Sequence, residues 1–156
     1  MAQSSNWYDA HAAELVRRYE LVDPAKLYGW LSGLLSEALG AVLDVGAGSG
    51  RDAGWFSALG HDVVAVEPSS RMRSEGQSRH SNPRIRWLND ELPELSETSQ
   101  LGISFDLVLL SAVWQNLAPT HRERAFRKVT QLVKSGGLLV ISLRAGPSWR
   151  SVRRIS

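Results

Sequence analysis

Residues 42–50 read Val-Leu-Asp-Val-Gly-Ala-Gly-Ser-Gly, a short and mostly apolar run that passes directly into three alternating glycines. Such a run, rich in β-branched residues, is typical of a strand buried on both faces of a parallel sheet. Glycine tolerates a sharp turn and lets the backbone approach a ligand without a Cβ atom in between. The stretch therefore predicts a buried strand followed by a tight turn at Gly46, Ala47, Gly48 and Gly50.

Further strands and helices alternate along the rest of the chain. This alternation indicates βαβ units with right-handed crossovers, and hence an open, mostly parallel sheet with helices on both faces. The strands are expected at residues 41–45, 62–66, 84–88, 105–110 and 138–143, with helices at 52–59 and 69–77 and a further helix opened by a capping box at Thr120-x-x-Glu123.

Two helices are expected before the first strand. Residues 6–20 have apolar side chains at helical spacing, and Asp23 followed by Pro24 predicts the start of a second helix that runs to Leu39. We therefore divide the single structural domain into a helical cap (1–40), a ligand-binding core (41–147) and a basic tail (148–156).

Composition limits the class of protein. With 43% hydrophobic and 22% charged residues, the chain is typical of a globular domain. It contains no cysteine, which excludes disulfides and thiolate metal sites, and no metal is expected. The sequence shows no signal peptide and no apolar stretch long enough to span a membrane, so we expect a cytoplasmic protein.

The charge balance is weakly basic, with a formal net charge of +2 and a pI near 9.3. The excess gathers in the basic tail, where arginines are most simply explained as a solvated terminus. No aromatic and basic residues alternate as in single-strand-binding proteins, so a nucleic-acid partner is not expected.

The spacing of the glycines separates two classes of ligand. A dinucleotide-binding turn has the pattern G-x-G-x-x-G, and its third glycine would fall at Arg51. The acid at Asp44 would also repel a pyrophosphate, whereas it suits a cationic or hydrogen-bond-donating ligand. Glu67, directly after the second strand, is placed to accept the hydroxyls of a ribose.

These motifs, taken together, resemble the class I (Rossmann-like) SAM-dependent methyltransferase family. The resemblance covers about residues 40–147 and implies a Rossmann-like, doubly wound sheet of about five strands in the order 3-2-1-4-5. S-adenosylmethionine (SAM) is the cofactor that it implies. The matching stretches are Val42 to Gly50, Val63 to Pro68, Asn89-Asp90-Glu91, Phe105 to Ser111, and Lys134 to Leu139, which is similar to a Lys-Pro-Gly-Gly turn.

The resemblance also implies a role for individual residues. The methionine part of SAM is expected at the turn, the ribose at Glu67 with Pro68, the adenine at Asn89 and Asp90, and the sulfonium beside Ser111. The residues expected around the methionine part are Asp44, Gly46, Ala47, Gly48 and Gly50.

The methyl acceptor and any general base stay open. Relatives often carry a histidine after the fourth strand where this chain has Asn116, and an asparagine cannot act as a base. Tyr8, Tyr19 and Trp114 are expected near the substrate, as an aromatic lid over the methyl group. The expected function is methyl transfer to a small molecule; the alternatives are a SAM-binding module without turnover and an NAD(P)-binding domain.

The end of the chain departs from the family pattern. Only about a dozen residues follow Leu143, too few for the last two strands of the family's seven-stranded sheet, so the chain is expected to be shortened or a minimal variant. The strand around Ile141 is then expected to be an open edge, or to pair with a second copy in a homodimer.

Overall fold

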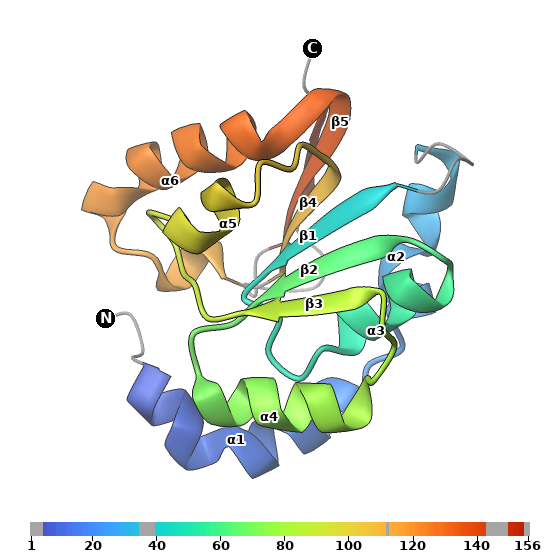
Figure 1. Cartoon of the computed structure of the whole chain (residues 1–156), viewed down its shortest axis with the longest axis vertical. Helices are drawn as coiled ribbons and strands as arrows, with labels where there is room; N and C mark the ends of the chain where they lie inside the picture. Colours follow the sequence, from blue (N-terminus) through green and yellow to red (C-terminus); the bar gives the residue numbers. More distant parts are fainter. Residues whose placement is uncertain (1–4, 35–39, 112, 143–149, 155–156) are drawn as a thin grey trace.

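A mostly parallel sheet runs through the centre of the molecule (Figure 1). The structure is a computed structural model that describes residues 5–34, 40–111, 113–142 and 150–154. Among these residues, the sheet has six strands in the order β3-β2-β1-β4-β5-β6. The elements are α1 (Ser5–Glu20), α2 (Pro24–Tyr28), η1 (Gly29–Gly33), β1 (Ala41–Val45), α3 (Arg51–Ala58), β2 (Asp62–Val66), α4 (Ser70–Arg79), β3 (Ile85–Leu88), α5 (Ser96–Gln100), β4 (Phe105–Ser111), η2 (Trp114–Asn116), α6 (Pro119–Leu132), β5 (Val133–Ser142) and β6 (Arg150–Arg154).

The two faces of the sheet are covered by different helices. Alternate side chains of a strand point to opposite faces, so Val42 of β1 packs in one core cluster and its neighbour Leu43 in another. The first cluster contains Phe56 of α3, and the second contains Val129 of α6. In Figure 1, α3 and α4 lie on one side of the sheet and α5 and α6 on the other.

The helix α1 packs outside α4 and runs parallel to it. A small cluster of buried apolar side chains joins the two helices. At the N-terminal ends, Asp9 accepts hydrogen bonds from the Ser69 hydroxyl and from the Arg71 backbone N–H. At the C-terminal ends, His80 Nε2 lies 2.7 Å from Glu20 Oε1. These contacts hold α1 against the outer side of α4 (Figure 1).

The predicted fold class is confirmed. The strands β1 to β5 are parallel and lie in the order 3-2-1-4-5, with helices on both faces. Asp23 caps α2 by accepting from the Ala25 N–H at 3.0 Å. None of the described helices is long and apolar enough to cross a bilayer; the cytoplasmic location stays a prediction.

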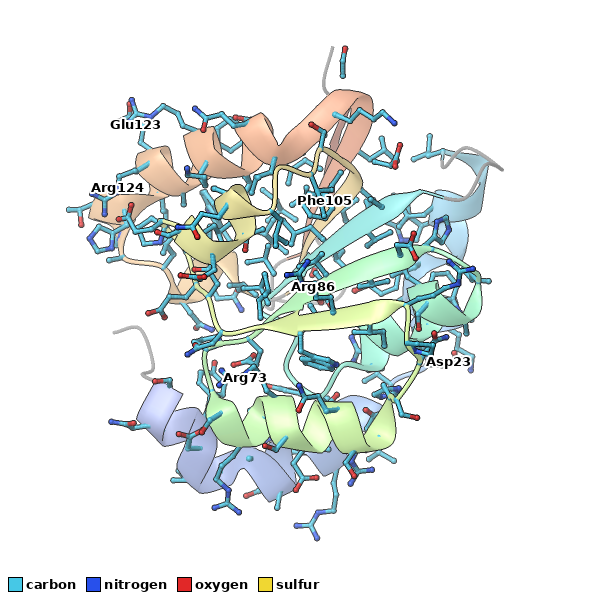
Figure 2. The ribbon with its side chains drawn as sticks, viewed as in Figure 1. Asp23, Arg73, Arg86, Phe105, Glu123 and Arg124 are labelled. Carbon is cyan, nitrogen blue, oxygen red and sulfur yellow. The ribbon has the colours of Figure 1, made fainter. Side chains whose placement is uncertain are left out.

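Two local predictions are wrong. The capping box does not form, because Pro119 at the first helical position starts α6 earlier, directly after Ala118. Glu123 instead points away from the protein (Figure 2) and lies 3.7 Å from Arg127. The second helix of the cap is also shorter than predicted, since α2 changes to the 3₁₀ helix η1 at Gly29, a weak α-helix former. Residues 35–39 of that prediction lie outside the described residues.

The open edge predicted at Ile141 is also wrong. The strand β6 pairs antiparallel with β5, with Leu138 opposite Arg154 and Ser142 opposite Arg150. An unpaired strand exposes a row of backbone donors and acceptors, and the short β6 satisfies those of β5 within the same chain. The residues expected as a solvated basic tail therefore contribute a strand, and the edge suggested for a homodimer is occupied.

Proline substitutions test the pairing of β5 with β6. Neighbouring residues of a strand direct their N–H groups to opposite sides, so only one of Ser151 and Val152 donates to β5. We expect one of Ser151→Pro and Val152→Pro to lower the free energy of unfolding by about 1–3 kcal/mol. The other variant is its matched control, because proline is tolerated where the N–H faces outward.

Urea unfolding gives the stability, and hydrogen exchange gives the pairing. In the destabilised variant, alternate amides of residues 138–142 should lose protection, since the others point to β4. If both variants unfold like the wild-type protein, β6 is not paired with β5.

Candidate functional site

A left-handed turn follows β1. Gly46, Gly48 and Gly50 have φ values of 72°, 57° and 81°, a region that side-chain-bearing residues rarely adopt. The N–H groups of Gly46 and Ala47 both donate to the carbonyl of Val66, at 2.8 and 2.9 Å. The turn is therefore fixed to the end of β2, where parallel sheets bind their ligands.

Side chains of the protein itself pack against these glycines. A Cβ atom at Gly50 would lie 2.7 Å from the ring of Trp87, and one at Gly48 would lie 3.3 Å from the ring of Tyr19. At Gly46, a Cβ atom would overlap Val113. The backbone conformation and internal packing are thus enough to explain all three glycines, without a ligand.

Asp44 lies two residues before the turn and is almost completely buried, at 1% exposure. Neither of its carboxylate oxygens has a partner within hydrogen-bond geometry among the described residues, although the backbone N–H of Ala53 is directed at the group and lowers its pKa in part. Burial, and then the nearby carboxylate of Asp52, raise the pKa of Asp44 well above its ordinary value, and Arg51 offsets only part of this. The hydroxyl of Ser49, which the sequence did not single out, is also buried without a partner. A buried polar group without a partner is costly, so these atoms indicate a place for a hydrogen-bond-donating ligand.

Glu67 is held at the end of β2 by the backbone of the turn. Its Oε1 accepts from the Gly48 N–H at 3.0 Å and its Oε2 from the Ser69 N–H at 2.8 Å. Arg73, which extends from α4 toward the end of β2 (Figure 2), donates to the Glu67 carbonyl at 2.7 Å. Burial raises the pKa of Glu67 although these hydrogen bonds lower it in part. Pro68 follows, partly exposed.

The two residues expected to meet the adenine differ in their surroundings. Asp90 accepts hydrogen bonds at 2.8 Å from both the N–H and the hydroxyl of Thr98, and so holds the start of α5. Its other oxygen accepts from the Glu91 N–H at 2.9 Å. Asn89 is exposed directly after β3. The structure thus shows a structural role for Asp90, and an adenine contact by either residue stays a prediction.

A polar network that the sequence did not predict joins the cap to the turn. The Tyr28 hydroxyl donates to Asp52 at 2.7 Å and lies 3.3 Å from the Ser111 hydroxyl, at the end of β4. Arg51 donates to Asp52 at 2.8 Å and to the Tyr19 carbonyl at 3.1 Å. Burial and Asp52 raise the pKa of Tyr28, so its hydroxyl keeps its proton.

The three aromatic residues expected near the substrate do not form one lid. Tyr8 and Tyr19 pack with the α1–α4 cluster, whereas Trp114 packs with the core cluster under α6. The Asn116 side chain donates to the Tyr8 hydroxyl at 3.3 Å. Tyr8 therefore lies near the segment after β4, but Trp114 faces a different core.

The fold and the turn define a class: a doubly wound sheet in the order 3-2-1-4-5 with a glycine-rich turn after β1, as in Rossmann-like methyltransferases. Residues 42–137, more than half of the chain, match the model of a family described as a methyltransferase domain. The chain belongs to this family, the class I SAM-dependent methyltransferases.

A curated relative is similar over most of the chain. The demethylmenaquinone methyltransferase of Beutenbergia cavernae is 28% identical over 145 residues, which cover 87% of this chain and 57% of the relative. The chain thus spans little more than half the length of the relative it matches.

Solved structures share the fold. A TehB-like SAM-dependent methyltransferase from Corynebacterium glutamicum has a TM-score of 0.69 at 24% identity, covering 90% of this chain and 76% of its own. DhpI, solved with S-adenosylhomocysteine (SAH), has a TM-score of 0.68 at 21% identity, covering 97% and 78%. The N-methyltransferase NodS from Bradyrhizobium japonicum, also solved with SAH, has a TM-score of 0.63 at 19% identity, covering 82% and 70%.

Replacing Asp44 by asparagine tests how much the burial of this acid lowers the free energy of unfolding. The folded protein raises the pKa of Asp44, so the stability that this group contributes is present below its unfolded pKa and lost as the pH rises through its folded pKa. Asp44→Asn cannot ionise and escapes this loss. The variant should therefore gain stability over the wild type by up to about 1.4 kcal/mol per pH unit above about pH 4, while Asp44 titrates.

Urea unfolding at a series of pH values measures this gap. Asp62→Asn is the control, because Asp62 is an exposed acid paired with Arg84 on the surface. If the difference in the free energy of unfolding between Asp44→Asn and the wild-type protein stays constant with pH, the raised pKa assigned to Asp44 is contradicted.

Alanine at two glycines separates strain from overlap. Gly102 has a φ of 65° and open space around its Cα, so Gly102→Ala should cost only the left-handed strain of about 1–2 kcal/mol. Gly50→Ala should cost about 1–3 kcal/mol more, because its Cβ also overlaps Trp87. Adding Trp87→Phe should recover part of that difference in denaturant unfolding; equal costs for the two alanines would contradict the packing.

Proposed function

We propose that this chain binds SAM at the carboxyl ends of β1 and β2 and transfers its methyl group to a small-molecule acceptor. The buried carboxylate of Asp44, without any partner at the turn, supports the proposal most directly. It fits the amino group of the methionine part of SAM, and it does not fit a pyrophosphate. Arg51 stands where a dinucleotide site has its third glycine, which also disfavours that class of ligand.

The other parts of the cofactor fit the neighbouring strand ends. Each carboxylate oxygen of Glu67 accepts one backbone N–H, so each keeps a free lone pair for a ribose hydroxyl. Pro68 would lie beside the ribose, and Asn89 and Asp90 would lie at the adenine. Ser111 would lie beside the sulfonium. The turn itself would hold the methionine part through Asp44, Gly46, Ala47, Gly48 and Gly50.

The chemistry requires alignment more than acid–base catalysis. SAM, when bound, supplies a methyl group on an activated sulfonium for in-line displacement. The chain's own part is to hold donor and acceptor in line and exclude water. Tyr28 keeps its proton and Asn116 donates to Tyr8, so neither accepts a proton from the substrate. The acceptor would then react as a neutral amine or another group that needs no base in the protein.

A SAM-binding module without turnover is the second candidate. It is favoured by one observation, that the chain spans 57% of the length of its curated relative. In this reading, the cap (1–40) and the core (41–147) hold the cofactor, and walls of the acceptor site are contributed by other residues. Incubation with SAM labelled on the methyl group and a small-molecule extract separates the two, since only an enzyme produces a labelled product.

Calorimetric titration tests the proposed cofactor. SAM and SAH should bind and NADH should not, because Arg51 stands where a dinucleotide turn has its third glycine and the Asp44 carboxylate would repel a pyrophosphate. Glu67→Gln should weaken SAM binding about tenfold or more, the loss expected for a hydrogen bond to a charged group. Glu91→Gln, at an exposed acid after β3, should leave it unchanged. Binding of NADH without SAM or SAH would overturn the proposal.

A further inference from the structure

Several titratable groups surround Asp44. Arg51 and Asp52 of α3 face it, and so does Glu67, directly after β2. The hydroxyl of Tyr28, from α2, also faces it. The three carboxylates are buried close to one another; Arg51 is the guanidinium that acts on Asp44, and Arg73 acts on Glu67. Ionised carboxylates at this spacing repel one another, so the free site favours a neutral form of one of them.

The hydrogen bonds identify the neutral one. Asp52 is paired with Arg51 and accepts from Tyr28, and Glu67 accepts from two backbone N–H groups. Each of these contacts stabilises an ionised carboxylate. Among the described residues, Asp44 has no contact that meets hydrogen-bond geometry; the backbone N–H of Ala53 is directed at it and lowers its pKa only in part. Burial and the charge of Asp52 raise the pKa of Asp44, in agreement with this assignment.

The same contacts indicate what Asp44 receives from a ligand. Two buried oxygens require at least two donors and, once ionised, a positive charge nearby. A primary ammonium group supplies three N–H donors and that charge. Arg51 supplies only part of that charge, because its hydrogen bonds are to Asp52 and to the Tyr19 carbonyl and not to Asp44.

We propose that Asp44 is a proton-exchanging ammonium site, which is protonated in the free protein and releases that proton when the ammonium group of the bound ligand arrives. The O–H bond of the carboxyl group breaks, the proton passes to solvent, and a carboxylate–ammonium ion pair forms. The inference rests on the proposed function, since the ammonium group belongs to the methionine part of SAM.

Exchange of this kind makes cofactor affinity depend on pH. Below the pKa of Asp44 in the free protein, each unit of pH should strengthen SAM binding by up to tenfold, because one proton leaves for each ligand bound. The α-amino group of the ligand is protonated below about pH 7.7 and does not titrate in this range. The pH dependence is therefore assigned to the protein.

Calorimetry at a series of pH values from about 5 to 8, in phosphate and in imidazole, measures the number of protons released at each pH from the difference in heat between the two buffers. Wild-type protein should release protons with SAM and with SAH, up to one per ligand bound at the pH where release is greatest. 5′-Methylthioadenosine, which has the adenosine and the sulfur but no ammonium group, should bind without release. Asp44→Asn should bind SAM without release, and Glu67→Gln should bind more weakly but still release the proton.

Each outcome decides the inference. SAM binding without proton release, equal release with 5′-methylthioadenosine, or undiminished release in Asp44→Asn overturns it and leaves the proposed function intact. Failure of both SAM and SAH to bind overturns the proposed function together with it. If Asp44→Asn does not fold, the wild-type protein decides alone: SAM affinity that is constant from about pH 4, the ordinary pKa of a carboxyl group, to about pH 7 contradicts the exchange.

Discussion

Two backbone amides, those of Gly46 and Ala47, donate to one carbonyl oxygen, that of Val66. This shared acceptor fixes the turn after β1 to the end of β2, in the register that pairs Val45 with Val66. With the turn in this position, the Gly48 N–H reaches Glu67, and the next residues start α3. The left-handed conformation of the glycines makes this geometry possible, since a residue with a side chain would strain it. The arrangement of the site depends on this link between two neighbouring parallel strands.

This geometry brings three buried acids, Asp44, Asp52 and Glu67, close to the turn. Their hydrogen-bond partners differ. Asp52 has a guanidinium and a phenol as partners, and Glu67 has two amides. Asp44, on the central strand β1, has no partner within hydrogen-bond geometry among the described residues, and only the Ala53 N–H directed at it offsets its burial in part. A fold selected only for stability would place an apolar residue here, because an unpartnered acid is costly to bury. The presence of Asp44 in spite of the cost of burying it is best explained by a ligand that donates hydrogen bonds to its carboxylate.

The sequence predicts the strands of the sheet because each strand is marked by a local pattern of residues. Buried parallel strands are apolar runs, and four of the five predicted strands match the structure within one or two residues; the fifth begins earlier, at Val133. The sequence indicates Asp44 and Glu67 because they lie at the carboxyl ends of two of these strands. The sequence does not predict the Tyr28–Asp52 contact, since its two residues are distant in sequence and no pattern links them. The strand β6 was missed because five residues rich in arginine carry no strand pattern, and only the unpaired edge of β5 explains their conformation.

The helical cap (1–40) is joined to the candidate site by side-chain hydrogen bonds. Two of its polar contacts with the core lie at the carboxyl ends of the strands: Arg51 donates to the Tyr19 carbonyl, and Tyr28 reaches Ser111. In the segment after β4, the Asn116 side chain donates to the Tyr8 hydroxyl. An amide cannot take up a proton, but it forms a stable link between α1 and the segment after β4. At this position, the chain thus has a contact that holds the cap in place of a group capable of acid–base chemistry, which is consistent with a reaction governed by alignment.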